Sequence, residues 1–162
     1  MDNELKLQTT QRVLCFSLGK LEYAIPLISV REVIAIPVIT SVPYTPPHFL
    51  GIMNLRGQIL SVIDLRMKFS LKSSRTEETA VVICDLQSLC VGFVVDSVNF
   101  VLEVQENSTR PNPQLVPPAT NDCIVSLINN NDRLIMLLDI AKALNLEDHS
   151  ALNKASALQR AA

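Results

Sequence analysis

The sequence predicts an all-β fold with short helices, built from two small, similar barrels that pack on a shared hydrophobic interface. Three observations support this prediction. Apolar residues make up 48% of the 162 residues, and the aliphatic ones far outnumber the 5 Phe and 2 Tyr, a composition that favours strands. Strand-like runs recur between short turns along the chain. These runs also form an internal repeat, which indicates two related units rather than one large sheet.

A hairpin is expected at the start of each unit. The first joins Val13–Leu18 to Leu21–Ile25 through the turn Gly19-Lys20. The second joins Val81–Leu86 to Leu89–Val95 through residues 87 and 88. The two hairpins and the residues after them align at an offset of 68, which pairs Phe16 with Cys84, Ala24 with Gly92, Val30 with Val98 and Val33 with Val101.

A further hairpin is expected at the end of each unit. The segment Ile59–Leu65 matches Leu134–Ile140 at an offset of 75, and turns at residues 55–58 and 129–132 precede them. In each copy an aspartate, Asp64 or Asp139, follows the strand and is expected to cap a short helix that runs to residue 69 or 144. Barrels suit such short strands because closure removes exposed sheet edges.

The repeat also gives the expected domain boundaries. One domain is predicted over residues 12–145, with barrel halves at roughly 13–79 and 80–145 and the polar stretch Ser70–Glu78 as the connector. Residues 1–11 and 146–162 are expected to be tails. The C-terminal tail carries a weak apolar stripe at Leu152, Ala155 and Leu158, which leaves both a docked helix and a frayed segment open.

Charge and hydropathy argue against several function classes. The 14 Lys and Arg against 16 Asp and Glu give a net charge of −2, without the basic surface that nucleic acid requires. The N-terminal residues lack the basic and apolar regions of a signal peptide, and no apolar run approaches the roughly 18 residues of a membrane span. We therefore expect a cytoplasmic protein with no nucleic-acid partner and no direct membrane insertion.

No pattern of reactive side chains predicts catalysis. The 4 cysteines stand singly among aliphatic residues, and without a CxxC motif the chain has the spacing for neither a zinc site nor a disulfide framework. Asp64 and Asp139 invite comparison with a carboxylate dyad, but Leu65 and Ile140 follow them instead of the small residues that a dyad needs. Helix capping accounts for both aspartates. We expect no enzyme activity, no catalytic residue, no metal and no cofactor.

The turn Asn54-Leu55-Arg56-Gly57 allows two interpretations. In the first it is a tight hairpin turn, where Gly57 supplies a positive φ and Arg56 is simply solvated. In the second, Arg56 is an interaction point, because a guanidinium held on a rigid turn can form paired hydrogen bonds with a carboxylate or with carbonyl oxygens. The residues of the turn alone leave both open.

The segment Gly51–Arg66, GIMNLRGQILSVIDLR, closely resembles the signature segment of CheW-type chemotaxis coupling proteins. The likeness covers roughly residues 12–145 in family order, and departs from the family at Ser61, where many members have proline, and at residues 125–127, which lack a glycine. The flanking matches are Phe16–Gly19, Tyr23–Pro26 and Val30–Ile34 at the start, Val91–Val98 in the second half, and Leu134–Leu144 at the end.

This resemblance implies two five-stranded, SH3-like barrels and a scaffold protein of bacterial chemotaxis. It implies that barrel surfaces pair with the homologous regulatory domain of the histidine kinase CheA. It also implies that a groove between the halves receives the cytoplasmic tip of a methyl-accepting chemoreceptor. The contact residues that it implies are Val30, Glu32, Asn54, Arg56, Gly57, Val98 and Val101.

Two alternatives stay open at this point. The chain could be a coupling protein of another chemosensory pathway, such as one that governs pili or a second messenger. A small β-barrel enzyme or ligand-binding protein is the alternative from a different class. That class needs convergent polar groups in an interior pocket, and the sequence indicates none.

Overall fold

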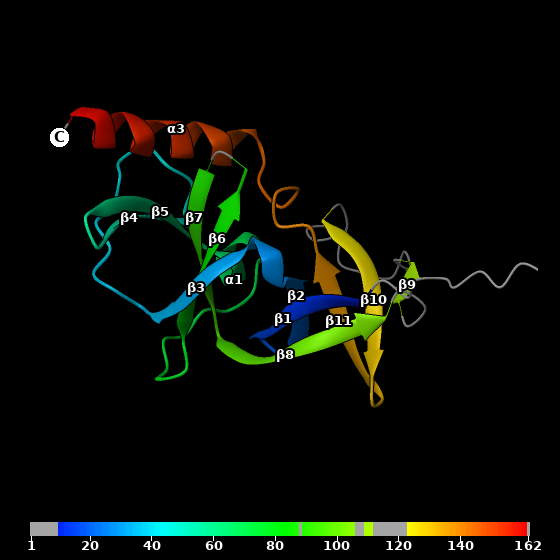
Figure 1. Ribbon diagram of the computed structural model, residues 1–162. Coiled ribbons are helices and arrows are strands. Elements are labelled where there is room, and N and C mark those ends of the chain that lie inside the picture. The colour runs from blue at the N-terminus through cyan, green and yellow to red at the C-terminus, as the bar shows by residue number, and fades with distance from the viewer. Residues whose placement is uncertain (1–9, 88, 106–108, 112–122, 162) are drawn as a thin grey trace, which may run out of the picture.

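The computed structural model describes residues 10–87, 89–105, 109–111 and 123–161 and contains two β-sheets (Figure 1). Residues 1–9 of the expected N-terminal tail lie outside this described part. The elements are β1 (Thr10–Leu18), β2 (Leu21–Pro26), the 3₁₀ turn η1 (Leu27–Ser29), β3 (Val30–Ala35), β4 (Phe49–Leu55), β5 (Gln58–Asp64), α1 (Leu65–Lys68), β6 (Ala80–Leu86), β7 (Leu89–Val95), β8 (Ser97–Gln105), β9 (Thr109–Pro111), β10 (Ile124–Asn130), β11 (Arg133–Leu138) and α3 (Leu146–Ala161).

The two sheets place repeat-related strands in the same order. The six-stranded sheet runs β8-β1-β2-β11-β10-β9, and the five-stranded sheet runs β3-β6-β7-β5-β4. Each sheet therefore combines strands of both repeats. The hairpin β1-β2 of the first repeat lies between β8 and β11 of the second, and the hairpin β6-β7 of the second lies between β3 and β5 of the first. The expected division into barrel halves at residues 13–79 and 80–145 is wrong for this reason. Sequence alignment of a repeat shows which strands are alike, but not which strands form hydrogen bonds with one another.

In each sheet, a short backbone contact near the end strands curls the sheet into a barrel-like shape. Thr40, downstream of β3, bridges to Ile52 of β4 through two backbone hydrogen bonds of 2.8 Å. Gly51 permits this approach, since its φ is 140° and a Cβ there would lie 2.0 Å from the Thr40 carbonyl oxygen. In the other sheet β9 pairs with β10 at the equivalent place. The all-β fold of two similar barrel-like units is confirmed.

The largest hydrophobic cluster lies between the two sheets. Phe16 and Tyr23 enter it from the six-stranded sheet, and Ile63 and Phe93 enter it from the five-stranded sheet, all at 0–1% exposure. The ring of Tyr23 lies 6.2 Å from that of Phe16 and 5.9 Å from that of Phe69. Two smaller clusters lie within the individual barrels. The expected hydrophobic interface between the units is thus the main core of the protein.

The two expected capped helices differ. Asp64 caps α1, because its side chain accepts hydrogen bonds from the backbone N–H groups of Arg66 and Met67. Asp139 accepts in the same way from Ala141 and Lys142, at 3.1 and 3.3 Å, but the chain there forms consecutive three-residue turns rather than an α-helix. The expected second helix to residue 144 is therefore wrong, and Asp139 caps a turn.

The C-terminal tail forms a docked helix, α3, which lies across β4 and β5 (Figure 1). It buries Ala151, Leu152 and Ala155 at 2–4% exposure. Its first turn is a capping box, since the Asp148 N–H donates to Asn145 Oδ1 at 2.9 Å and the Asn145 N–H donates to Asp148 Oδ2 at 3.0 Å. In the part of the chain that the structure describes, no helix is long and apolar enough to cross a membrane.

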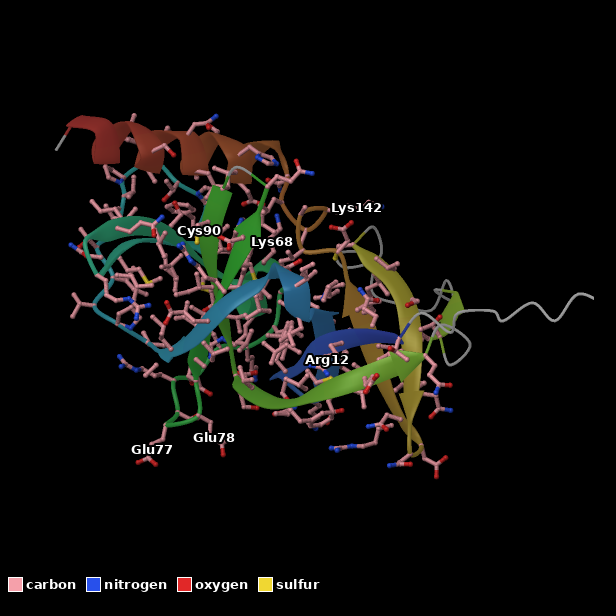
Figure 2. All side chains as sticks on the ribbon, in the orientation of Figure 1. Arg12, Lys68, Glu77, Glu78, Cys90 and Lys142 are labelled. Atoms are coloured by element: carbon pink, nitrogen blue, oxygen red, sulfur yellow. The ribbon has the colours of Figure 1, made fainter. Side chains whose placement is uncertain are left out.

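Asp148 also anchors α3 to the rest of the protein. Its carboxylate is 0% exposed and pairs with Lys68 at 2.6 Å and with the ring of His48. In Figure 2, Lys68 is labelled beside the strands of the five-stranded sheet, below α3. Burial alone would raise the pKa of Asp148, but hydrogen bonds from Lys68, the Asn145 backbone and His48 outweigh it and hold the pKa below its usual value. The ionised carboxylate therefore holds the helix in place.

Candidate functional site

The turn between β4 and β5 is rigid. Leu55 pairs with Gln58, so that Arg56 and Gly57 form a two-residue turn, and both have positive φ, 51° and 87°. These angles are those of the tight turns that suit hairpin twist. The Gly57 N–H donates to Asn54 Oδ1 at 2.9 Å, which ties the start of the turn to its end. The predicted positive φ at Gly57 is confirmed, and the structure adds the same conformation at Arg56.

Glu32 of β3 reaches this turn and forms an ion pair with Arg56. β3 and β4 are the two end strands of the five-stranded sheet, so the pair spans the seam where the barrel closes. The Arg56 side chain remains 71% exposed and the Glu32 side chain 28% exposed. An exposed pair contributes about 0–1 kcal/mol to stability. The guanidinium is thus oriented by Glu32 and still has donors that face solvent.

Arg31 is a neighbour of the turn that the sequence interpretation missed. It lies at a β-bulge, since Val30 pairs with Cys84 and Glu32 with Ile83. Its guanidinium donates to Gln58 Oε1 at 3.2 Å and to Cys90 Sγ at 3.6 Å. A bulge leaves no signature in the sequence, so its position could not be derived from the residues alone.

The predicted valines lie on β3 and β8, the strands with which the chain enters each sheet after crossing from the other. Val30 begins β3, Val98 is the second residue of β8, and both are half-buried against the cluster between the sheets. Val101 is 51% exposed further along β8, and Val33, its partner in the repeat, is 41% exposed on β3. The expected contact residues therefore span both sheets. Among these expected contact residues, the described part of the chain shows two side-chain polar contacts. One joins Arg56 to Glu32, and the other joins Gly57 to Asn54.

An apolar hollow lies beside the turn. Its volume is about 330 Å³, and its lining includes Val38, Ile52, Asn54 and Ile59. Val38 is 89% exposed. The sequence interpretation missed this hollow because Val38 belongs to the irregular segment after β3, where no strand periodicity indicates which side chains face outward.

The side chains considered for catalysis are engaged in structural contacts. Asp64 holds Arg66 and caps α1, whereas Asp139 caps a turn after a strand of the other sheet. All four cysteines are free thiols, and burial raises the pKa of Cys84 to about 12. A thiol with such a pKa stays protonated and unreactive at neutral pH. Among the described residues, no group of three or more His, Cys, Asp or Glu side chains could hold a metal ion.

Comparison with known proteins gives one consistent family. The model of the CheW-like domain matches residues 12–148. The chemotaxis protein CheW of Klebsiella aerogenes is 34% identical over 85% of this chain and 84% of its own, and that of Bacillus subtilis is 30% identical over 88% and 92%. The crystal structure of the scaffolding protein TtCheW from Thermoanaerobacter tengcongensis superimposes with a TM-score of 0.79 at 28% identity, covering 86% of this chain and 96% of that one.

Proposed function

Because the chain belongs to the CheW-like family, we propose that it is a non-enzymatic adaptor which couples transmembrane chemoreceptors to the histidine kinase CheA. It acts in the cytoplasm and is recruited from there to receptor arrays. Its contribution is geometric, since an adaptor of this kind has to hold two partners in a defined relation without transforming either. The family match and the scaffold relative support this proposal.

The observation that carries the proposal at the level of residues is the presentation of Arg56. Its backbone is held by the two-residue turn, and its side chain is oriented by Glu32 while 71% exposed. A guanidinium that is already oriented loses little entropy on binding, and arginine is enriched among residues that dominate interface energies. We assign Glu32, Asn54, Arg56 and Gly57 to the polar part of the partner contact.

The valines supply the apolar part of the contact. Val30, Val98 and Val101 lie on β3 and β8, where an amphipathic helix of a receptor could rest its apolar face. Val33 belongs with them, because it is exposed and is the repeat partner of Val101.

Replacement of Arg56 by alanine tests this assignment. The variant should retain its thermal stability within about 0.5 kcal/mol, since the side chain is exposed and its ion pair is weak. Its affinity in co-sedimentation with receptor-bearing membranes and CheA should fall by about thirtyfold, corresponding to about 2 kcal/mol.

Lys20→Ala is the matched control, because Lys20 is an exposed cation in the turn between β1 and β2. It should leave both stability and co-sedimentation unchanged. An Arg56→Ala protein that assembles with normal affinity, or one that unfolds, would show that Arg56 is not a contact residue.

A further inference from the structure

Arg66 fills a cleft between the two sheets. Its guanidinium donates to Asp64 at 3.0 and 3.1 Å, to Asp96 Oδ1 at 3.0 Å and to the Ser74 carbonyl at 2.8 Å. The other oxygen of Asp96 accepts from the Gly19 N–H at 2.6 Å, in the turn of the opposite sheet. The cleft is thus occupied by a buried cation, flanked by two carboxylates and covered by the connector.

The repeat generates a second cleft of the same kind. The equivalents of Gly19, Asp64 and Arg66 are Gln87, Asp139 and Ala141. Residues 87, 139 and 141 line a groove of about 580 Å³. Lys142, labelled in Figure 2, marks the turn at one end of it. The aliphatic part of the lining includes Pro26, Leu86, Leu89, Val125, Ile140 and Leu144.

Two differences leave this second cleft open. Alanine stands at position 141 in place of the arginine, so this position places no guanidinium in the groove. The chain after the turn also takes another course. In the first copy the connector stays at the cleft, where Leu71 lies against Gly19 and Ser74 contacts Arg66, whereas in the second copy the chain enters α3 and packs on β4 and β5.

Two carboxylates, Asp139 and Asp85, line the open groove. No lysine or arginine of the described residues forms an ion pair with either, although Asp85 interacts electrostatically with Arg31. Asp139 accepts only backbone N–H groups, at 3.1 and 3.3 Å from one oxygen, among the bonds that the described part of the chain shows. An aliphatic surface with carboxylates at its edge is complementary to a cation that is flanked by aliphatic side chains.

We propose that this groove is a docking site for a segment of a partner protein that presents an arginine between aliphatic side chains. The guanidinium of that segment binds Asp139, as Arg66 binds Asp64 in the equivalent cleft, and its neighbours cover Pro26, Leu86 and Ile140. The site is distinct from the Arg56 turn, so it gives the adaptor a contact surface beyond those of the proposed function.

The chain supplies a natural probe for this site. A capped synthetic peptide with the sequence of residues 65–74, LRMKFSLKSS, carries the arginine and the aliphatic residues that fill the first cleft. Added to the full-length ¹⁵N-labelled protein, it should shift the amide resonances of residues 85–89 and 139–144 with sub-millimolar affinity. A second peptide with citrulline in place of arginine keeps the shape without the charge. It should bind about tenfold more weakly, because a charge-assisted hydrogen bond is lost.

Two variants locate the binding. Asp139→Asn keeps a capping side chain but removes the charge, and should weaken the arginine peptide about tenfold. Ala141→Arg places a guanidinium beside Asp139, as in the first cleft, and should abolish peptide binding. An unchanged melting temperature of this variant would show that its fold is intact. Absence of shifts at millimolar peptide, equal binding of the citrulline peptide, or binding unchanged in both variants would each overturn the proposal. Neither receptor nor kinase enters the experiment, so its failure leaves the adaptor role untouched.

Discussion

Arg66 offers the sharpest test of how the two sheets are held together. The residue is 4% exposed, and its guanidinium joins Asp64 of the five-stranded sheet to Asp96, which in turn binds the turn at Gly19 in the six-stranded sheet. Burial by itself would lower the pKa of Arg66, but the hydrogen bonds and charges of the two aspartates outweigh it and keep the pKa raised. The arginine is therefore a permanent cation between two carboxylates.

Replacement by methionine keeps much of the side-chain volume and removes the charge. Loss of one partner from a buried ion pair costs about 3–5 kcal/mol, because the remaining charge stays buried and unpaired. That penalty applies fully to Asp64, which is 2% exposed, and less to Asp96, whose side chain is 27% exposed. We expect a loss of about 3–4 kcal/mol, which is a large part of the roughly 5–15 kcal/mol that stabilises a domain. The melting temperature should fall by about 10 °C.

Urea unfolding followed by circular dichroism measures this loss. Arg75→Met is the matched control, since Arg75 is an exposed arginine of the connector and should change stability by no more than about 0.5 kcal/mol. Addition of Asp64→Asn to Arg66→Met should recover about 1–2 kcal/mol, because asparagine still caps α1 and no longer carries an unpaired charge. A loss below about 1 kcal/mol for Arg66→Met, or no recovery in the double variant, would refute the reasoning.

Three further predictions concern the fold. Residues 1–79 and 80–162, expressed separately, should each lack a sharp thermal transition, because β1 and β3 pair with strands of the other fragment; a cooperative transition in either would contradict the need for strand pairing between the two fragments. Asp148→Ala should speed amide hydrogen exchange in α3 at neutral pH. Since the pKa of Asp148 is held below its usual value, its stabilisation is fully present above about pH 4 and is lost progressively as the pH falls from there through the lowered pKa. Protection of α3 that does not decline between about pH 4 and the acid unfolding of the protein would count against the anchor. Gly51→Ala should cost more than about 2 kcal/mol in thermal unfolding, because its Cβ would meet the Thr40 carbonyl, whereas Gly57→Ala should cost about 1 kcal/mol, because nothing lies within 4 Å; equal losses would show that the close approach is not limiting.

Local patterns in the sequence predicted the local parts of the fold. The hairpins around Gly19 and residue 87 form as expected, because a turn and two flanking apolar runs lie within a few residues of each other. The pairing of β3 with β6 and of β8 with β1 could not be predicted in this way. Strand partners far apart in sequence are chosen by the packing of the whole core.

The features of the candidate site also fall into two groups, those that a local pattern predicts and those that depend on tertiary structure. The conformation of the turn could be predicted from Gly57, since a positive φ is a property of single residues. The ion pair of Arg56 with Glu32 depends on barrel closure, which brings residues 24 positions apart into contact. The role of Arg31 depends on a bulge, and the hollow beside Val38 depends on an irregular segment. These features arise from tertiary geometry.

The two crossings of the chain between the sheets explain why the proposed receptor contacts lie where they do. Val30 follows η1 where the chain enters the five-stranded sheet, and Val98 lies two residues after Asp96 where the chain enters the six-stranded sheet. The two sheets are held together by the large hydrophobic cluster between them and by the hydrogen bonds of Asp96 with Ser17 and Gly19. A surface formed at these two crossings changes shape only if that packing is disturbed. That rigidity suits an adaptor, because a partner helix resting on Val30 and Val98 transmits its orientation to both barrels at once.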